Sequence, residues 1–245
     1  MKWVVLALGL VIGSFLNVVI YRLPRGLGFV RGRSFCPKCK HKINWFDNVP
    51  VISFLILKGR CRFCGGKISW RYPLIELLAG ALFYLSYLSH LSFLSYLLIC
   101  GLVVIFFIDL EHQIIPDEIV IPLSILFLVY FLMTNPQLLI TNYLITALIS
   151  FLFLYFIFLL TKGKGMGFGD VKLAFLMGLV LGFPKIVVAF YLAFLTGAFI
   201  GIILILLGKA KLKQKIAFGP FLVFGTIFSL LWGEKIVTLA EKVLL

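Results

Sequence analysis

Long apolar stretches separated by short polar segments dominate this sequence and limit the folds that it can adopt. A helix that crosses a bilayer needs about 20 mostly apolar residues. Hydrophobic residues make up 62% of the chain and charged residues 13%, whereas a soluble globular domain carries about 25% charged residues. We therefore predict an all-α polytopic membrane protein with about eight transmembrane helices. The eight stretches are roughly Trp3–Ile20, Pro73–Ser89, Leu91–Ile108, Glu118–Met133, Leu138–Leu160, Val171–Gly182, Ile186–Leu207 and Phe218–Trp232.

Two of these stretches need comment. Val171–Gly182 is short for a span, so we expect it to be tilted, to be partly covered by protein, or to extend beyond these limits. The first stretch resembles a signal peptide in position, but it has no small-residue cleavage site and contains Asn17 in its interior. We therefore interpret it as an uncleaved first span.

The net charge of +14 is explained by membrane topology. With the first loop in the cytoplasm, segments 21–72, 109–117, 161–172 and 208–217 carry 19 of the 23 Lys and Arg residues. The remaining four basic residues are Lys2, Lys185, Lys235 and Lys242. This distribution satisfies the positive-inside rule and predicts that both termini lie outside. Membrane lipid is then the expected partner of the basic loops, and no nucleic-acid partner is expected.

Four of the five cysteines form two CxxC pairs in the only long polar loop. The pairs are Cys36–Cys39 and Cys61–Cys64, with twenty-one residues between the inner cysteines. Four thiolates with this spacing are typical of a structural zinc site, which would also supply folding energy to a small loop. Disulfides or unpaired thiols are the alternative, which a cytoplasmic location disfavours. Cys100 lies within an apolar run and is interpreted as a buried apolar residue.

We divide the chain into a first transmembrane helix (1–20), a cytoplasmic zinc-knuckle loop (21–72) and a transmembrane core (73–245). The loop contains an apolar stretch, Pro50–Leu57, that is too short to span a bilayer. It is expected either to form a small core or to rest on the membrane face.

Five of the nine acidic residues lie in two short segments that open on the same predicted side. Asp117 is a natural N-cap of the fourth helix, and Asp170 can also cap a helix. We interpret Glu111 and Glu118 as solvated residues, and His112 as a surface residue beside a helix end. Asp109 differs, because it ends the third helix, where the helix dipole disfavours an anion. An acid with no structural role at the membrane edge indicates chemistry.

Two carboxyls that meet in a poorly hydrated site share a proton, as in aspartic proteases. One activates a water molecule, and the other polarises the peptide carbonyl. From the opposed dipoles of their helix ends, we expect Asp109 to be the protonated partner and Asp170 to be the base. Glycines at 165, 167 and 169 would allow a sharp turn or a close approach to substrate, although a flexible loop explains them equally well.

Together these motifs resemble the type 4 prepilin peptidases, which process proteins of bacterial pili and type II secretion. The resemblance covers nearly the whole chain. It is carried by the four cysteines, by both aspartate motifs and by the segments Gly13–Pro24, Arg71–Glu76 and Phe218–Phe221.

This resemblance implies an intramembrane aspartic endopeptidase in the bacterial inner membrane, with Asp109 and Asp170 as its catalytic pair. It would remove the basic leader of prepilins or pseudopilins on the cytoplasmic side. Family members with the cysteine loop also methylate the new N-terminus with S-adenosylmethionine. No residues for methyl transfer can be identified from this sequence, so that activity rests on the resemblance alone.

Two other classes of protein are alternatives. In a transporter, Asp109 and Asp170 would be intramembrane ion ligands, but both lie at span ends, and transport gives no reason for the cysteine loop. A non-catalytic assembly protein would use the loop to dock a partner and would tolerate Asn at both positions.

Overall fold

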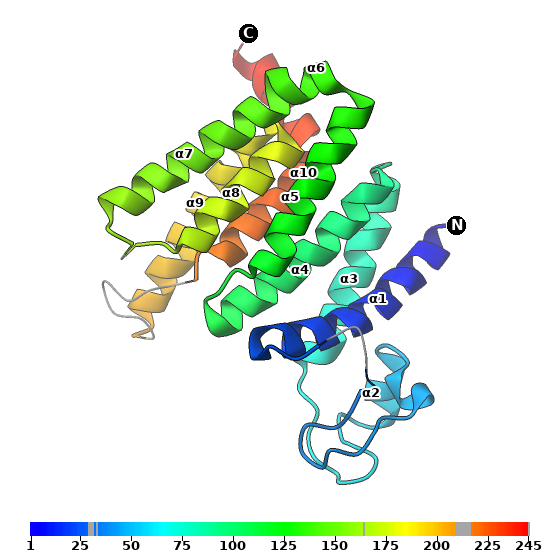
Figure 1. The fold of residues 1–245 in the computed structure, drawn as a ribbon. Coiled ribbons are helices and arrows are strands. Elements are labelled where there is room, and N and C mark those ends of the chain that lie inside the picture. The colour runs from blue at the N-terminus through cyan, green and yellow to red at the C-terminus, as the bar shows by residue number, and fades with distance from the viewer. Residues whose placement is uncertain (29–31, 33, 164, 209–216, 245) are drawn as a thin grey trace. The chain divides into compact units, whose positions relative to one another are not determined.

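The computed structural model describes residues 1–28, 32, 34–163, 165–208 and 217–244, which form helices joined by irregular loops (Figure 1). In the described part, the only β structure is a pair of isolated bridges in the cysteine loop. The prediction of an all-α chain is therefore confirmed. The elements are α1 (Lys2–Arg22), η1 (Leu23–Arg25), η2 (Trp45–Asn48), α2 (Ile52–Ile56), α3 (Arg71–Leu88), α4 (Phe93–His112), α5 (Asp117–Thr134), α6 (Pro136–Leu138), the π-helical turn η3 (Leu139–Leu144), α7 (Ile145–Leu160), α8 (Phe168–Leu181), α9 (Lys185–Leu206) and α10 (Gly219–Leu244).

All eight predicted apolar stretches are helical, and the fifth is built from α6, η3 and α7 in succession. Among the described residues, six helical segments are long and apolar enough to cross a membrane. Helices α3 and α8 are not among them, so the chain is polytopic but the count of eight is not confirmed. The basic residues counted in the loop 208–217, together with Arg31, Arg33 and Lys164, lie outside the described residues.

The chain divides into two compact units, Met1–Val104 and Ile105–Leu245. In the first unit, α1 and α3 pack in antiparallel directions through small residues. A β-carbon on Gly9 would lie 2.8 Å from the α-carbon of Gly80, and one on Gly13 would lie 2.7 Å from that of Glu76. Small residues four apart allow two helix backbones to approach this closely within a bilayer.

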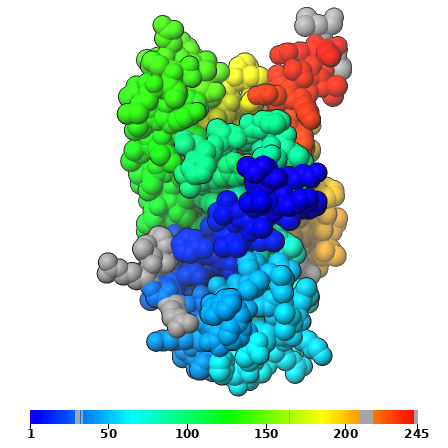
Figure 2. Space-filling view, turned by 90° about the vertical axis from the view of Figure 1, so that its right-hand side faces the viewer, coloured from blue at the N-terminus to red at the C-terminus, as the bar shows by residue number. Residues whose placement is uncertain are grey.

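The cysteine loop gathers at one end of the α1–α3 pair (Figure 2). Two polar side chains hold this end together. Asn17 of α1 donates to the backbone carbonyl of Tyr72 (3.1 Å) at the start of α3. The carboxylate of Glu76 accepts a hydrogen bond from the backbone N–H of Val51 (2.8 Å) in the loop. Both side chains are buried, so these bonds satisfy groups that would be costly to leave unpaired.

In the second unit, the short helix α8 lies among α5, α7, α9 and α10 (Figure 1). Nine of its fourteen residues are buried. The contact with α7 is again made by a small residue, since a β-carbon on Gly178 would lie 2.6 Å from the α-carbon of Ala147. Because protein rather than lipid surrounds α8, the helix does not need the length of a free span. This agrees with the expectation that the sixth stretch is partly covered by protein.

Candidate active site and metal centre

Asp109 and Asp170 line a single cavity of about 180 Å³ in the second unit. Asp109 lies in the last turn of α4, and Asp170 lies in the first turn of α8. The cavity is bounded by three connecting segments, between α4 and α5, between α7 and α8, and before α10. Residues that are 61 positions apart in the sequence therefore share one site at the end of the helical bundle. The lining residues besides the aspartates are Gln113, Ile115, Gly165, Met166, Gly167, Gly169, Ala217 and Phe218.

The carboxyl of Asp109 is almost fully buried, with 5% of the residue exposed. Its Oδ2 atom has no hydrogen-bond partner among the described residues. The same oxygen lies against Gly219, the first residue of α10, where a β-carbon would be only 2.6 Å from it. The absence of a β-carbon at this position leaves space for the Asp109 carboxyl.

Asp170 combines a structural contact with a free oxygen. Its Oδ2 accepts a hydrogen bond from the backbone N–H of Gly167 (2.9 Å), the N-cap residue of α8. This is the return half of a capping box, in which an acidic N3 side chain satisfies the N-cap amide. Asp170 is 6% exposed, and its Oδ1 has no partner in the described part of the chain. Each aspartate thus keeps one buried oxygen that can exchange a proton with a bound molecule.

The three glycines at the start of α8 all line the cavity. The backbone φ angles of Gly165, Gly167 and Gly169 do not fall in the left-handed region. A β-carbon on Gly169 would lie 2.9 Å from Cβ of Ile115, so this glycine allows the α7–α8 and α4–α5 connections to pack closely. The close approach is made to protein, and it closes the cavity wall.

Asp117 is not the N-cap that the sequence predicted. Helix α5 begins at Asp117 itself, Pro116 is the N-cap, and no side chain caps the helix. The carboxylate instead pairs with Lys172 Nζ (2.7 Å), which joins α5 to α8 two residues after Asp170. The helix dipole also favours an acid in this first turn. Glu111 and Glu118 are exposed, as the sequence predicts.

Sequence reasoning missed Gln113. This residue follows α4, lines the cavity and has a φ of 56°, a left-handed conformation that non-glycine residues rarely adopt. It also missed the closeness of Gly219 to Asp109 and the place of Phe218 in the cavity wall. No local pattern reports these positions, because they depend on how distant helices pack.

Cys100 is half-buried within α4, and His112 is half-buried with its Nε2 atom buried.

The four predicted metal ligands meet in the first unit. The sulfurs of Cys36, Cys39, Cys61 and Cys64 all lie within 4.8 Å of one another. The Sγ atoms of Cys36 and Cys64 are 3.9 Å apart. Four thiolates at about 2.3 Å from a tetrahedral zinc would be about 3.8 Å apart. The donor set and its spacing therefore fit a metal ion of this kind.

The two knuckles have the same backbone construction. The N–H of Cys36 donates to the carbonyl of His41, and the N–H of Cys61 donates to that of Gly66. Each turn then needs a left-handed residue four positions after its first cysteine, and these are Lys40 (φ 61°) and Gly65 (φ 63°). Burial opposes ionisation of the Cys36 thiol, but nearby backbone and thiol hydrogen bonds outweigh it and lower the pKa to about 7. A backbone hydrogen bond from His41 favours the Cys39 thiolate, but desolvation and hydrogen bonds with the same neighbouring thiols outweigh it and raise the pKa of Cys39 to about 11. One thiol of the cluster therefore ionises before the others, and a thiolate is the form that binds metal.

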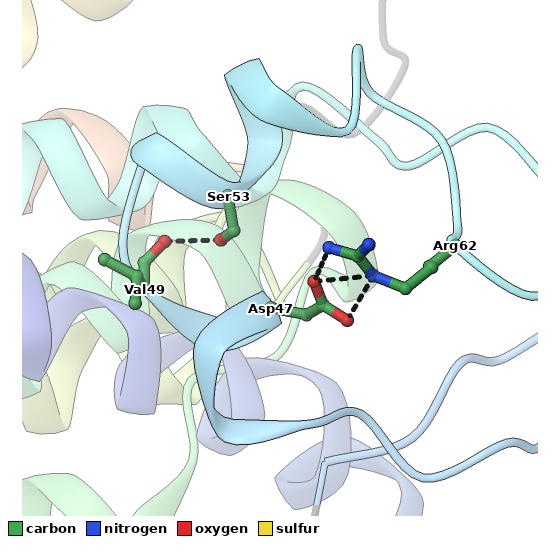
Figure 3. A network of polar contacts seen from close by, with 4 residues as sticks. All are labelled: Asp47, Val49, Ser53 and Arg62. Atoms are coloured by element: carbon green, nitrogen blue, oxygen red, sulfur yellow. Dashed lines mark hydrogen bonds and ion pairs between the residues drawn. The ribbon is translucent and has the colours of Figure 1, made fainter.

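An ion pair joins the second knuckle to the segment between the pairs (Figure 3). Arg62 donates to Asp47 through Nη2 (2.7 Å) and Nε (3.0 Å), and this contact raises the pKa of the guanidinium. Beside it, the Ser53 hydroxyl donates to the backbone carbonyl of Val49 (Figure 3). These contacts fix η2 and α2 relative to the metal ligands.

The fold and the site define a polytopic membrane protein with two buried aspartates around a cavity and a four-cysteine loop. The family model "Bacterial Peptidase A24 N-terminal domain" matches residues 7–90, and "Type IV leader peptidase family" matches residues 96–202. The chain belongs to the type IV leader peptidase family.

Curated proteins named prepilin leader peptidase/N-methyltransferase are similar along most of their length. The Stutzerimonas stutzeri protein is 36% identical over 94% of this chain and 90% of its own. The Aeromonas hydrophila protein is 36% identical over 93% and 89%, and the Bacillus subtilis protein 32% identical over 97% and 96%. The chain matches no solved structure.

Proposed function

We propose that this protein is an intramembrane aspartic endopeptidase that removes the leader from prepilins or pseudopilins. The observation that carries the proposal is the burial of Asp109 and Asp170 around one cavity. Each keeps one carboxyl oxygen that forms no hydrogen bond with any described residue. Relatives that match nearly the whole chain are named prepilin leader peptidase/N-methyltransferase, and these names support the same activity.

In the proposed reaction, the Asp170 carboxylate takes a proton from a water molecule as the water attacks the peptide carbonyl. Asp109 holds a proton and donates it to the carbonyl oxygen, which gives a gem-diol intermediate. When the C–N bond breaks, the proton that Asp170 took from water passes to the leaving amine, and Asp109 takes a proton back from a gem-diol hydroxyl as the carbonyl re-forms. The hydrogen bond from Gly167 N–H and the N-terminal end of α8 stabilise negative charge on Asp170. Asp109, at the C-terminal end of α4, has no such support from its helix.

The position of the cavity suits a substrate in which a polar leader joins an apolar helix. A peptide bond within a helix is shielded, so the substrate must unwind locally before hydrolysis. The cavity lies at the end of the bundle, where such a junction would reach it from the membrane edge. We propose that this end and the cysteine loop face the cytoplasm of a multi-pass inner-membrane protein, with both termini outside, as the basic loops indicate.

We further propose that the protein methylates the new N-terminal amine with S-adenosylmethionine and that the cysteines hold a structural zinc ion. The names of the relatives support the methyl transfer. The sulfur spacing supports the zinc site, in which the metal would supply folding energy to a loop with little core of its own.

The test uses the purified full-length protein in detergent with a model prepilin, and leader removal is followed by mass spectrometry. Asp109→Asn and Asp170→Asn should each abolish cleavage, while Glu241→Gln, which changes an exposed acid near the end of α10, should not. Adding S-adenosylmethionine should increase the product mass by one methyl group. Cleavage that persists in both Asn variants would refute the aspartyl mechanism.

A further inference from the structure

The short helix α2 presents an apolar face that the proposed reaction does not use. Ile52, Leu55 and Ile56 are 57%, 63% and 70% exposed, so three of the five residues of α2 lack protein cover. The stretch Pro50–Leu57 therefore does not form a closed core of its own. Three clustered aliphatic side chains on one short helix mark a binding surface.

Two contacts hold α2 beside the start of α3. The backbone N–H of Val51 donates to the Glu76 carboxylate (2.8 Å). The ring of Phe54 packs on that of Trp70, the residue just before α3, with centroids 4.8 Å apart. Val51 adopts a left-handed φ of 60°, a conformation that β-branched residues avoid, so the chain is held firmly at this point.

These contacts set the depth of α2 along the membrane helices. Glu76 is five residues past the start of α3, or about 7.5 Å along its axis at 1.5 Å per residue. On α1, Glu76 lies against Gly13. Gly13 is seven residues before the predicted end of the first span at Ile20, so it lies about 10 Å inside that end along the helix axis. Amphipathic helices in the membrane interface bury their apolar face by about 5–10 Å. Helix α1 is long and apolar enough to span a bilayer, so lipid is the medium at this depth.

The charge around α2 also favours a lipid surface. Lys58 and Arg60 follow the helix directly and are exposed. Residues 34–72 contain eight Lys and Arg residues and a single acid, Asp47, which pairs with Arg62. Trp70 is 74% exposed at the start of α3, which packs along the candidate span α1, and tryptophan is enriched at the headgroup level of membranes. Basic side chains beside an apolar face bind anionic headgroups.

We propose that α2 anchors the cysteine loop by inserting Ile52, Leu55 and Ile56 into the headgroup–acyl boundary of an anionic bilayer. The anchor keeps the loop at the membrane surface and holds the Val51 backbone donor against the buried carboxylate of Glu76. This inference does not depend on the peptidase activity.

The test places the photoreactive residue benzoylphenylalanine at position 56 of the full-length protein in phosphatidylethanolamine–phosphatidylglycerol liposomes. The matched control carries it at Phe63, which is 52% exposed at the tip of the second knuckle. A second pair of samples carries Leu55→benzoylphenylalanine, one without and one with a model prepilin. Bound zinc is measured in every variant to show that the loop is folded.

Irradiation should attach one phospholipid at positions 55 and 56 and none at 63, as seen by intact mass. Equal labelling at 56 and 63 would overturn the proposal, as would the absence of a lipid adduct at both 55 and 56. A cross-link from position 56 to a second copy of the chain, or from 55 to the prepilin in place of lipid, would assign the face to that partner and also overturn it.

Discussion

Gly219 lies against the carboxyl of Asp109, although 110 residues separate them in the sequence. A β-carbon at Gly219 would lie 2.6 Å from Asp109 Oδ2 and 3.0 Å from its carboxyl carbon. Real contacts of a β-carbon are not this short, so any larger residue must displace the carboxyl or the start of α10. The glycine therefore sets where one of the proposed catalytic oxygens can be.

We predict that Gly219→Ala reduces prepilin cleavage by about 100-fold, since a displacement of about 1 Å at a catalytic group costs that much. The variant should still fold, because α10 begins at this residue and tolerates alanine. The control is Gly197→Ala in α9, where the three atoms nearest to the added carbon are ring atoms of Phe221 and Phe218 at 3.3 to 3.5 Å, a normal contact distance or close to one. Cleavage rates are compared at equal amounts of folded protein. Wild-type activity in Gly219→Ala would contradict the close contact.

Asp170 has a structural role and a proposed chemical role, and two substitutions separate them. Asparagine keeps an oxygen that can accept from Gly167 N–H, whereas alanine removes it. We predict that Asp170→Ala destabilises the protein by about 1 kcal/mol, as for other helix caps, and that Asp170→Asn does not. Both variants should lose cleavage.

Thermal unfolding in detergent measures the first effect, and a shift of a few degrees is expected for a chain of this size. If Asp170→Asn also lowered the unfolding temperature by the same amount, the carboxylate charge, and not the hydrogen bond, would be the stabilising feature. If Asp170→Asn retained activity, Asp170 would be a cap only.

The ion pair between Asp117 and Lys172 provides a third test close to the site. Its side chains are 48% and 30% exposed, so solvent screens the pair and it should contribute less than about 1 kcal/mol. We predict that Asp117→Asn changes stability by no more than this and lowers cleavage only slightly. The effect should shrink at high salt. Loss of cleavage with unchanged stability would instead give Asp117 a part in the chemistry.

Local patterns in the sequence predict part of the fold and part of the site. The apolar stretches predicted the helices, because within a bilayer a helix is one of the few structures that satisfies every backbone hydrogen bond. The CxxC pairs predicted the sulfur cluster because their spacing suits one metal. Asp109 stood out because its helix end gives an acid no support.

Other features depend on packing between distant segments and could not be derived from local signals. Asp117 looked like an N-cap, yet its partner is Lys172 on another helix. A close approach at Gly169 could be suggested from the sequence, but its contact with Ile115 could not. Gly219 lies in a segment that carries the family resemblance, but its contact with Asp109 could not be seen in the sequence. In each case the deciding contact joins residues more than fifty positions apart.

The cysteine cluster gives the last prediction. We expect one zinc ion per chain by elemental analysis, and Cys64→Ser should lose it because three thiolates leave the tetrahedral shell incomplete. The loop should then become sensitive to proteolysis between the knuckles, since the metal supplies its folding energy. Acidification should release the metal as protons compete for the thiolates, and a strong chelator should do the same at neutral pH. Cys100→Ser is the control, because this half-buried residue lies in α4 and outside the cluster. Zinc retained by Cys64→Ser at full occupancy, or no zinc in the wild type, would contradict the proposed site.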